Sequence, residues 1–141
     1  MGDISKRLLG QRLRNRVMEE LYGLVEWKES LESVGFAEYF EAFFDQFPYE
    51  GVPYPNDAMT EAEREAVHNV HRLMIDASNA APKMMTEEHF IATGWPQRIE
   101  PIAEQALLLM LKRGRFSEEH EEGNPSCTNG WPWRERFSCG E

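Results

Sequence analysis

Cysteine is scarce in this chain of 141 residues, and long apolar runs are missing. Both cysteines, Cys127 and Cys139, lie within the last 15 residues, so they cannot supply the disulfide framework that stabilises many small secreted domains. The most apolar run, Ile102 to Leu111, falls well short of the roughly 20 residues that a membrane-spanning helix needs. The N-terminus also lacks the apolar stretch of a signal peptide. The sequence therefore predicts a cytoplasmic protein with one hydrophobic core.

Recognisable catalytic motifs are absent as well. No glycine-rich phosphate loop follows an apolar strand, and no serine or cysteine nucleophile stands in the turn that such nucleophiles occupy. The net charge of −10 argues against wholesale binding of nucleic acid, because the phosphate backbone would be repelled. These absences make an enzyme less expected than a binding protein, and they predict no cofactor.

Positive charge is concentrated at the N-terminus. Residues 1–16 contain five basic side chains against one acid, Asp3, whereas residues 17–50 contain nine acids against one base, Lys28. The basic arm could contact an anionic surface, including that of the protein itself. The acidic segment is expected to steer the molecule toward a basic protein partner.

The run from Ile102 to Leu111 is expected to form the central helix of an all-α bundle. Its apolar side chains cover most of the circumference of a helical wheel, so neighbouring helices must surround it. Pro101 fits the first turn of a helix and Gly114 fits its C-terminal cap, which predicts a helix over 101–113. A longer helix with a kink at Pro101 is the alternative.

Hydrophobic periodicity predicts a long first helix. Ser5 is a suitable N-cap, and the helix should end near Ser33, because Gly35 offers a left-handed terminator. The expected buried stripe consists of Leu9, Leu13, Val17, Leu21, Leu24 and Leu31.

The residues from Phe36 to Phe47 give the clearest helical pattern. Six aromatic side chains recur at helical spacing on one face, and acidic residues occupy the opposite face. Such a stripe more often packs in a core than it holds a ligand, so we expect the rings to pack against the central helix. Binding of an apolar small ligand among the rings is the alternative. The stripe consists of Phe36, Tyr39, Phe40, Phe43, Phe44 and Phe47.

Two more helices are predicted downstream. Thr60 opens a capping box at the start of a helix that ends near Ser78, and Thr86 caps a shorter helix that ends at Gly94. The stretch from Pro48 to Met59 is dense in proline, glycine and asparagine, so it is expected to be a loop. These elements predict a single compact bundle of four to five helices.

The composition changes after Gly114. An acidic stretch that cannot build a core follows, and then come Trp131, Trp133 and Phe137. Large aromatic side chains are costly to leave in water, so this end should dock on another surface. We therefore divide the chain into a helical bundle domain over 1–114, with a basic arm at 1–16, and an acidic linker with a docking tail over 115–141.

One spacing suggests a metal site. Glu65 and His68 share one helix face at the Glu-x-x-His spacing of di-iron bundles, and His71 follows one turn later. Such bundles need a second Glu-x-x-His, which is missing here. On the helical wheel His68 should face solvent and His71 should lie at the flank of the apolar stripe, which favours ordinary surface histidines. A metal-binding protein or metal-dependent hydrolase that uses Glu65, His68 and His71 is the alternative function.

An internal echo joins the last part of the bundle to the tail. Thr86-Glu-Glu-His and Gly94-Trp-Pro-Gln-Arg recur as Ser117-Glu-Glu-His and Gly130-Trp-Pro-Trp-Arg. Helix capping explains the hydroxyl, acidic and glycine positions, but it does not explain the repeated tryptophan and arginine. We expect the two tryptophans to occupy equivalent apolar pockets, one of which could lie on another chain. The predicted partner-binding residues are Trp95, Arg98, Trp131, Trp133, Arg134 and Phe137.

The sequence thus favours a non-catalytic protein-interaction module, such as an adaptor, an inhibitor or immunity-type protein, or a subunit of an assembly. It is expected to dock on a basic protein, or on a second copy of itself, through its acidic surface and its C-terminal tail.

Overall fold

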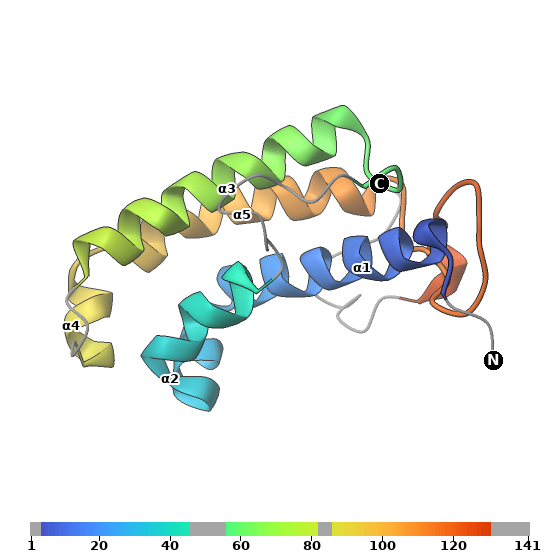
Figure 1. The fold of residues 1–141 in the computed structure, drawn as a ribbon. Coiled ribbons are helices and arrows are strands. Elements are labelled where there is room, and N and C mark those ends of the chain that lie inside the picture. The colour runs from blue at the N-terminus through green and yellow to red at the C-terminus, as the bar shows by residue number, and fades with distance from the viewer. Residues whose placement is uncertain (1–3, 46–55, 82–85, 131–141) are drawn as a thin grey trace.

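The computed structural model describes residues 4–45, 56–81 and 86–130. Within these ranges it is an all-α bundle without a β-strand, as predicted (Figure 1). In the described ranges, no helix is both long and apolar enough to cross a membrane. The helices are α1 (Lys6–Val25), α2 (Trp27–Phe44), α3 (Glu61–Ala80), α4 (Glu87–Ala92) and α5 (Trp95–Leu111), with a single 3-10 turn, η1 (Cys127–Asn129).

α5 is the central helix of the bundle. It packs between α1 and α3 and runs antiparallel to both of them (Figure 1). Leu107 and Met110 on its buried side are completely inaccessible to solvent. The prediction of a bundle built around this apolar helix is confirmed.

The start of α5 corrects the prediction that this helix begins at Pro101. Gly94, in a left-handed conformation (φ 83°), is the N-cap, and Pro96 occupies the first turn. Pro101 lies inside the helix, where it cannot donate a hydrogen bond to the preceding turn. Ile99 and Ala103 flank it and are fully buried, so their packing offsets the cost of the internal proline.

The first predicted helix consists of two helices in the structure. α1 ends at Val25, and Glu26 leaves the helical conformation (φ −93°, ψ 48°). Trp27 then opens α2, is 5% exposed, and donates its indole N–H to a carboxylate oxygen of Glu100 on α5 (2.7 Å). The turn at Glu26 therefore lets Trp27 reach the central helix, and the prediction of one uninterrupted helix from Ser5 to Ser33 was wrong.

Gly35 interrupts α2, as predicted: the element consists of two helical stretches that meet at a kink at this residue. Its backbone (φ 88°, ψ 173°) lies in a region that essentially only glycine adopts. The bend redirects the second half of α2, so that Ser33 and Glu38 line the same cleft from either side of it.

The predicted leucine stripe holds only in the second half of α1. Leu21 and Leu24 are buried there, but Leu9 is 38% exposed. In the first half, polar side chains take the buried positions, because a later segment of the chain lies on this part of the helix and its backbone groups need hydrogen-bond partners. The buried residues of this half are Gly10, Gln11, Arg14 and Asn15.

Tyr39, Phe40 and Phe43 of the aromatic stripe are buried in the core, as predicted, whereas the side chains of Phe36 and Phe47 lie outside what the structure describes. The rings of Tyr39 and Phe40 contact Phe90 of α4 edge-on, with centroids 5.3 and 5.4 Å away. Phe43 lies 6.0 Å from the ring of His71 on α3. α2 therefore packs on α3 and α4, and the expected packing of these rings against the central helix stays a prediction.

Three predicted helix starts are confirmed. The side chains of Ser5, Thr60 and Thr86 each accept a hydrogen bond from the backbone amide three residues later. Phe47 and residues 48–55 of the predicted loop lie outside the described residues.

Candidate functional site

Two groups of polar residues sit at opposite ends of α1, and the first of them is buried. Arg14 is 0% exposed and pairs with Glu63 of α3 at 3.0 Å. It also donates hydrogen bonds to the carbonyl oxygens of Met110 (3.0 Å) and Gly114 (2.7 Å) at the end of α5. Arg113 pairs with the same Glu63 carboxylate at 3.0 Å. Each charged group has partners, which is the condition for burying an ion pair.

The segment that follows Gly114 lies on α1. Gln11 donates to the carbonyl oxygens of Ser117 (3.0 Å) and His120 (2.9 Å) and accepts from the amide of Glu122 (2.8 Å). This stretch was expected to be a linker because of its acidic composition, yet its backbone is held by the first helix. We call Gln11, Arg14, Asn15 and Glu63, with residues 114–123, the polar end.

Asn15 and Phe116 complete the polar end. The Asn15 side chain donates to the carbonyl oxygen of Phe116 (2.9 Å) and accepts from its amide (3.2 Å). Phe116 itself is 2% exposed. The division of the chain at Gly114 stays a prediction, but the bundle includes contacts with residues beyond it.

Gly114 is required at the junction between α5 and this segment. Its φ of 96° is left-handed, and a side chain there would place a Cβ 2.4 Å from the carbonyl carbon of Ser126. Ser126 exchanges two backbone hydrogen bonds with Arg115, of 2.9 and 3.0 Å. Gly114 therefore terminates the helix, as predicted, and also lets the backbone of Ser126 approach closely.

The basic arm contacts the protein itself. Besides Arg14, Arg7 donates to the carbonyl oxygens of Glu122 (2.9 Å) and Gly123 (3.1 Å), and Arg12 donates to that of Glu118 (2.8 Å). These arginines are satisfied mainly by backbone carbonyls. They are therefore less available to an external anion than the sequence alone suggests.

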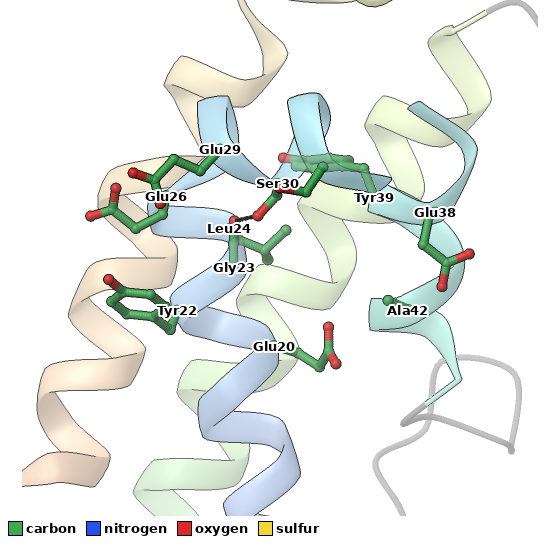
Figure 2. Close-up of a pocket in the computed structure, with 11 residues that line it drawn as sticks. Glu20, Tyr22, Gly23, Leu24, Glu26, Glu29, Ser30, Glu38, Tyr39 and Ala42 are labelled. Atoms are coloured by element: carbon green, nitrogen blue, oxygen red, sulfur yellow. Dashed lines mark hydrogen bonds between the residues drawn. The ribbon is translucent and has the colours of Figure 1, made fainter. Parts of the chain in front are cut away.

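The other end of α1 borders an acidic cleft (Figure 2). The cleft has a volume of about 360 Å³ and lies between the last turns of α1 and both halves of α2. A hydrogen bond from the Ser30 hydroxyl to the carbonyl oxygen of Gly23 (2.8 Å) ties the two helices together within it. Its polar lining includes Glu20, Glu26, Glu29, Ser30, Glu38 and Tyr39.

The carboxylates of the acidic cleft lie on two sides of α1. In Figure 2, Glu26 and Glu29 are on one side of this helix, and Glu20 and Glu38 are on the other. Partial burial, together with the negative charges of Glu38 and other nearby acids, raises the pKa of Glu20 to about 7, although Arg16 opposes the shift. Negative charge is therefore poorly compensated at this end of the molecule.

Tyr39 contributes a hydroxyl group without a partner. The residue is 4% exposed, and its buried hydroxyl oxygen makes no hydrogen bond. Burial raises the pKa of this phenol, so the group stays protonated. Figure 2 shows the ring lying across α2 with its hydroxyl end toward Ser30. A buried polar atom without a partner is uncommon in proteins, so this one needs an explanation.

The predicted partner-binding residues fall mostly outside the described ranges. Trp95 and Arg98 lie on the first turns of α5, where the Arg98 guanidinium stacks 4.2 Å from the centre of the Trp95 ring. Trp95 is partly buried and Arg98 is exposed. The remaining members, Trp131, Trp133, Arg134 and Phe137, lie outside the described residues.

The two copies of the echo differ in what their hydroxyl groups cap. Thr86 accepts the amide of His89 (3.1 Å) and starts α4, whereas Ser117 accepts the amide of His120 (3.3 Å) without starting a helix. In both copies, therefore, the hydroxyl group accepts the backbone amide three residues later and forms the same local turn. Capping explains this half of the echo, as the sequence suggested.

The predicted metal-site residues are not gathered around one point. His71 is buried against the rings of Phe43 and Phe44, whereas Glu65 is exposed. Burial and the nearby His68 lower the pKa of His71. Among the described residues, no three acidic, histidine or cysteine side chains are placed to hold a metal ion.

Cys127, in η1, is disulfide-bonded. The other cysteine of the sequence, Cys139, lies outside the described residues. A thiolate of Cys127 is therefore not available as a metal ligand in this structure.

Comparison with known proteins gives no match to any family, to any curated protein or to any solved structure. The candidate site must therefore be judged from its own geometry and charge.

Sequence reasoning missed the acidic cleft as a site. The available signal was the excess of nine acids over one base in residues 17–50. That signal indicated an acidic surface, but it could not show that the chain turns at Glu26 and bends at Gly35. These two changes of direction bring the carboxylates around one space.

Proposed function

We propose that this protein is a non-catalytic protein-interaction module that docks on a basic partner through an acidic face. This acidic face consists of the exposed acids of α2 and the acidic cleft beside them. The C-terminal tail, with Trp131 and Trp133, is proposed to add aromatic anchors to the same complex.

The uneven distribution of charge is the observation that carries the proposal. In residues 17–45, eight acids stand against one base, Lys28. Five of these acids have exposed side chains, four on α2 and one at its C-cap, so they are free to contact a partner. Opposite charges across an interface increase the rate of association and select the orientation of docking. The four on α2 are Glu29, Glu32, Glu38 and Glu41, and the C-cap residue is Asp45.

The arrangement of the arginines supports the same proposal. Arg7, Arg12 and Arg14 bind groups of the polar end, at the opposite end of α1 from the acidic cleft. These three arginines therefore do not neutralise the acidic face, and Arg16 offsets only part of the negative charge around Glu20. A basic surface on a partner would supply the missing counter-charge.

The test compares capture of a partner from the native cell by the intact protein and by two neutralised variants of equal net charge. The first variant removes the acidic face, and the second removes four exposed acids elsewhere. We expect the first to lose most of its partner and the second to retain it. The first carries Glu29→Gln, Glu32→Gln, Glu38→Gln and Glu41→Gln; the second carries Glu65→Gln, Asp76→Asn, Glu119→Gln and Glu121→Gln.

Equal losses in the two variants would mean that total charge matters and that the face does not, which contradicts the proposal. The rate of association with the captured partner should also fall steeply as salt is added, because exposed charges are screened. Trp131→Ala and Trp133→Ala test the tail separately and leave Cys139 in place. If neither changes the lifetime of the complex, the tail is not an anchor.

A further inference from the structure

We propose that the acidic cleft binds an alkylammonium group carried on an unbranched chain, which is the chemistry of a lysine side chain and of a free aliphatic polyamine. This inference deepens the proposed function, because it assigns a specific pocket within the acidic face. It rests on the shape of the cleft, on the placement of its carboxylates and on the hydroxyl of Tyr39.

The size of the cleft suits a small organic group. Its volume of about 360 Å³ lies at the lower end of the range of small-ligand pockets, about 300–1,000 Å³. Leu24 and Ala42 provide apolar wall beside the acids. A methylene chain can pack against such a wall while its charged end meets a carboxylate.

The spacing of the carboxylates favours an organic cation over a metal ion. Glu26 and Glu29 lie on one side of α1, and Glu20 and Glu38 lie on the other (Figure 2). Among the described residues, no three acids come close enough together to hold a metal ion. A chain with nitrogen atoms along its length, or a lysine side chain that enters from a partner, can reach separated carboxylates without needing a compact ligand shell.

Tyr39 provides an observation that does not depend on charge. Tyr39 lines the cleft, and its hydroxyl group is buried and has no hydrogen-bond partner. An ammonium group carries three N–H donors and no acceptor, so the phenol oxygen can accept one of them. The hydroxyl that is unexplained in the unliganded protein then acquires a partner.

Ionisation of Glu20 should be linked to binding. Its pKa of about 7 reflects partial burial and neighbouring negative charge. A bound cation stabilises the carboxylate form, so it should lower this pKa, and by linkage the affinity for the cation should rise as the pH passes through 7. This pH dependence distinguishes the cleft from an ordinary acidic surface.

The binding test uses spermidine, and a lysine capped at both ends, as separate probes, followed by NMR chemical shifts of the protein amides at low salt. We expect saturable shifts around the cleft, with a dissociation constant of about 1 mM or tighter. The capped norleucine, which lacks the ammonium group, should cause none. Tighter binding of spermidine points to a free polyamine, and tighter binding of the capped lysine points to a partner side chain.

A matched pair of variants locates the binding. Glu29 lines the cleft, whereas Glu32, on the same helix, does not. Glu29→Gln should weaken binding about threefold, and Glu32→Gln should leave it nearly unchanged. Glu20→Gln should remove the rise of affinity with pH. Equal weakening by the two α2 variants would overturn the proposal, because it would show only diffuse attraction to an acidic surface.

Tyr39→Phe gives two readouts of opposite sign. Removing a buried hydroxyl that lacks a partner should leave the melting temperature of the free protein equal or higher. The same substitution should weaken binding of the cation about threefold, because a hydrogen bond is lost. Unchanged affinity would overturn the proposal, as would the absence of saturable binding by either probe.

The two proposals can fail independently. If partner capture depends on the acidic face but neither probe enters the cleft, only the further inference is overturned. If the probes bind in the cleft but capture does not depend on the acidic face, the proposed function is overturned and the cleft is a small-molecule site.

Discussion

Charged and polar residues are concentrated at both ends of α1, but they have partners within the chain at one end, and some of them lack partners at the other. At the polar end, Arg14 is completely buried, and the other groups around it have partners within the chain. At the acidic cleft, Glu20 has a raised pKa and Tyr39 has an unpaired hydroxyl. Polar groups that satisfy one another hold a fold together, whereas groups left unsatisfied mark the place where something else can bind.

Removing Arg14 from the polar end should cause the largest loss of stability. Arg14→Ala leaves Glu63 buried with one fewer cationic partner and leaves the carbonyl groups of Met110 and Gly114 unsatisfied. We expect a loss of about 3 to 5 kcal/mol of unfolding free energy, measured by urea denaturation.

The matched control for this prediction is Arg16→Ala. Arg16 is exposed and only two residues away on the same helix, so its removal should change the unfolding free energy by less than about 0.5 kcal/mol. Similar losses in the two variants would mean that the buried ion pair does not distinguish the polar end.

The second-largest loss of stability is expected from removing the bend in α2. Gly35→Ala places a side chain on a backbone that only glycine adopts readily, which should cost about 1 to 3 kcal/mol. Among the described atoms, none lies closer than 4.0 Å to the added Cβ, so the expected cost comes from the backbone. Because the bend forms one wall of the cleft, this variant should also bind cations more weakly.

Gly23→Ala, in the same cleft, should increase the unfolding free energy, whereas Gly35→Ala should decrease it. Gly23 is helical, and an added Cβ would meet the Ser30 hydroxyl at an ordinary 3.5 Å. We expect a gain of about 0.5 kcal/mol from reduced freedom of the unfolded chain. Thermal unfolding of the two variants side by side tests the assignment, and equal destabilisation would contradict it.

The effect expected at Glu20 depends on pH. Because its pKa is raised from 4.5 to about 7, the folded state holds this proton more tightly than the unfolded state. Its contribution to stability is therefore greatest below pH 4.5 and is lost as the pH rises to about 7. The loss should be about 1 kcal/mol, since the partly exposed carboxyl is screened by water.

Glu20→Gln should flatten this dependence and make the protein more stable than the wild type above about pH 7. Glu41→Gln, on the exposed side of α2 away from the cleft, should leave the dependence in place. A pH profile that is the same in all three proteins would show that Glu20 ionises as an ordinary surface acid.

Local signals in the sequence predicted helices and caps well. Thr60 and Thr86 were recognisable because a hydroxyl group that accepts an amide three residues later leaves a fixed spacing. The run from Ile102 to Leu111 was recognisable because a helix that is apolar nearly all round has to be buried. Both signals depend on residues close together in the chain.

Long-range contacts explain where the sequence misled. The sequence predicted a buried leucine stripe through Leu9, but Gln11 and Asn15 are buried there because they hydrogen-bond to the backbone of a later segment. That segment lies more than 100 residues away in the sequence, so local periodicity could not reveal it. In the same way, Pro101 looked like a helix start because the burial of Ile99 was not visible locally. The acidic cleft could not be predicted because its shape depends on how the turn at Glu26 and the kink at Gly35 orient the helices in space.

The polar end also has a consequence for how the chain is made. Arg14 and Asn15 leave the ribosome early, yet the groups that satisfy them, at Gly114 and Phe116, are synthesised about 100 residues later. Until then α1 carries a guanidinium and an amide on the face that later faces inward. The bundle should therefore close only when almost the whole chain has emerged, and nascent chains that stop before Gly114 should remain sensitive to protease.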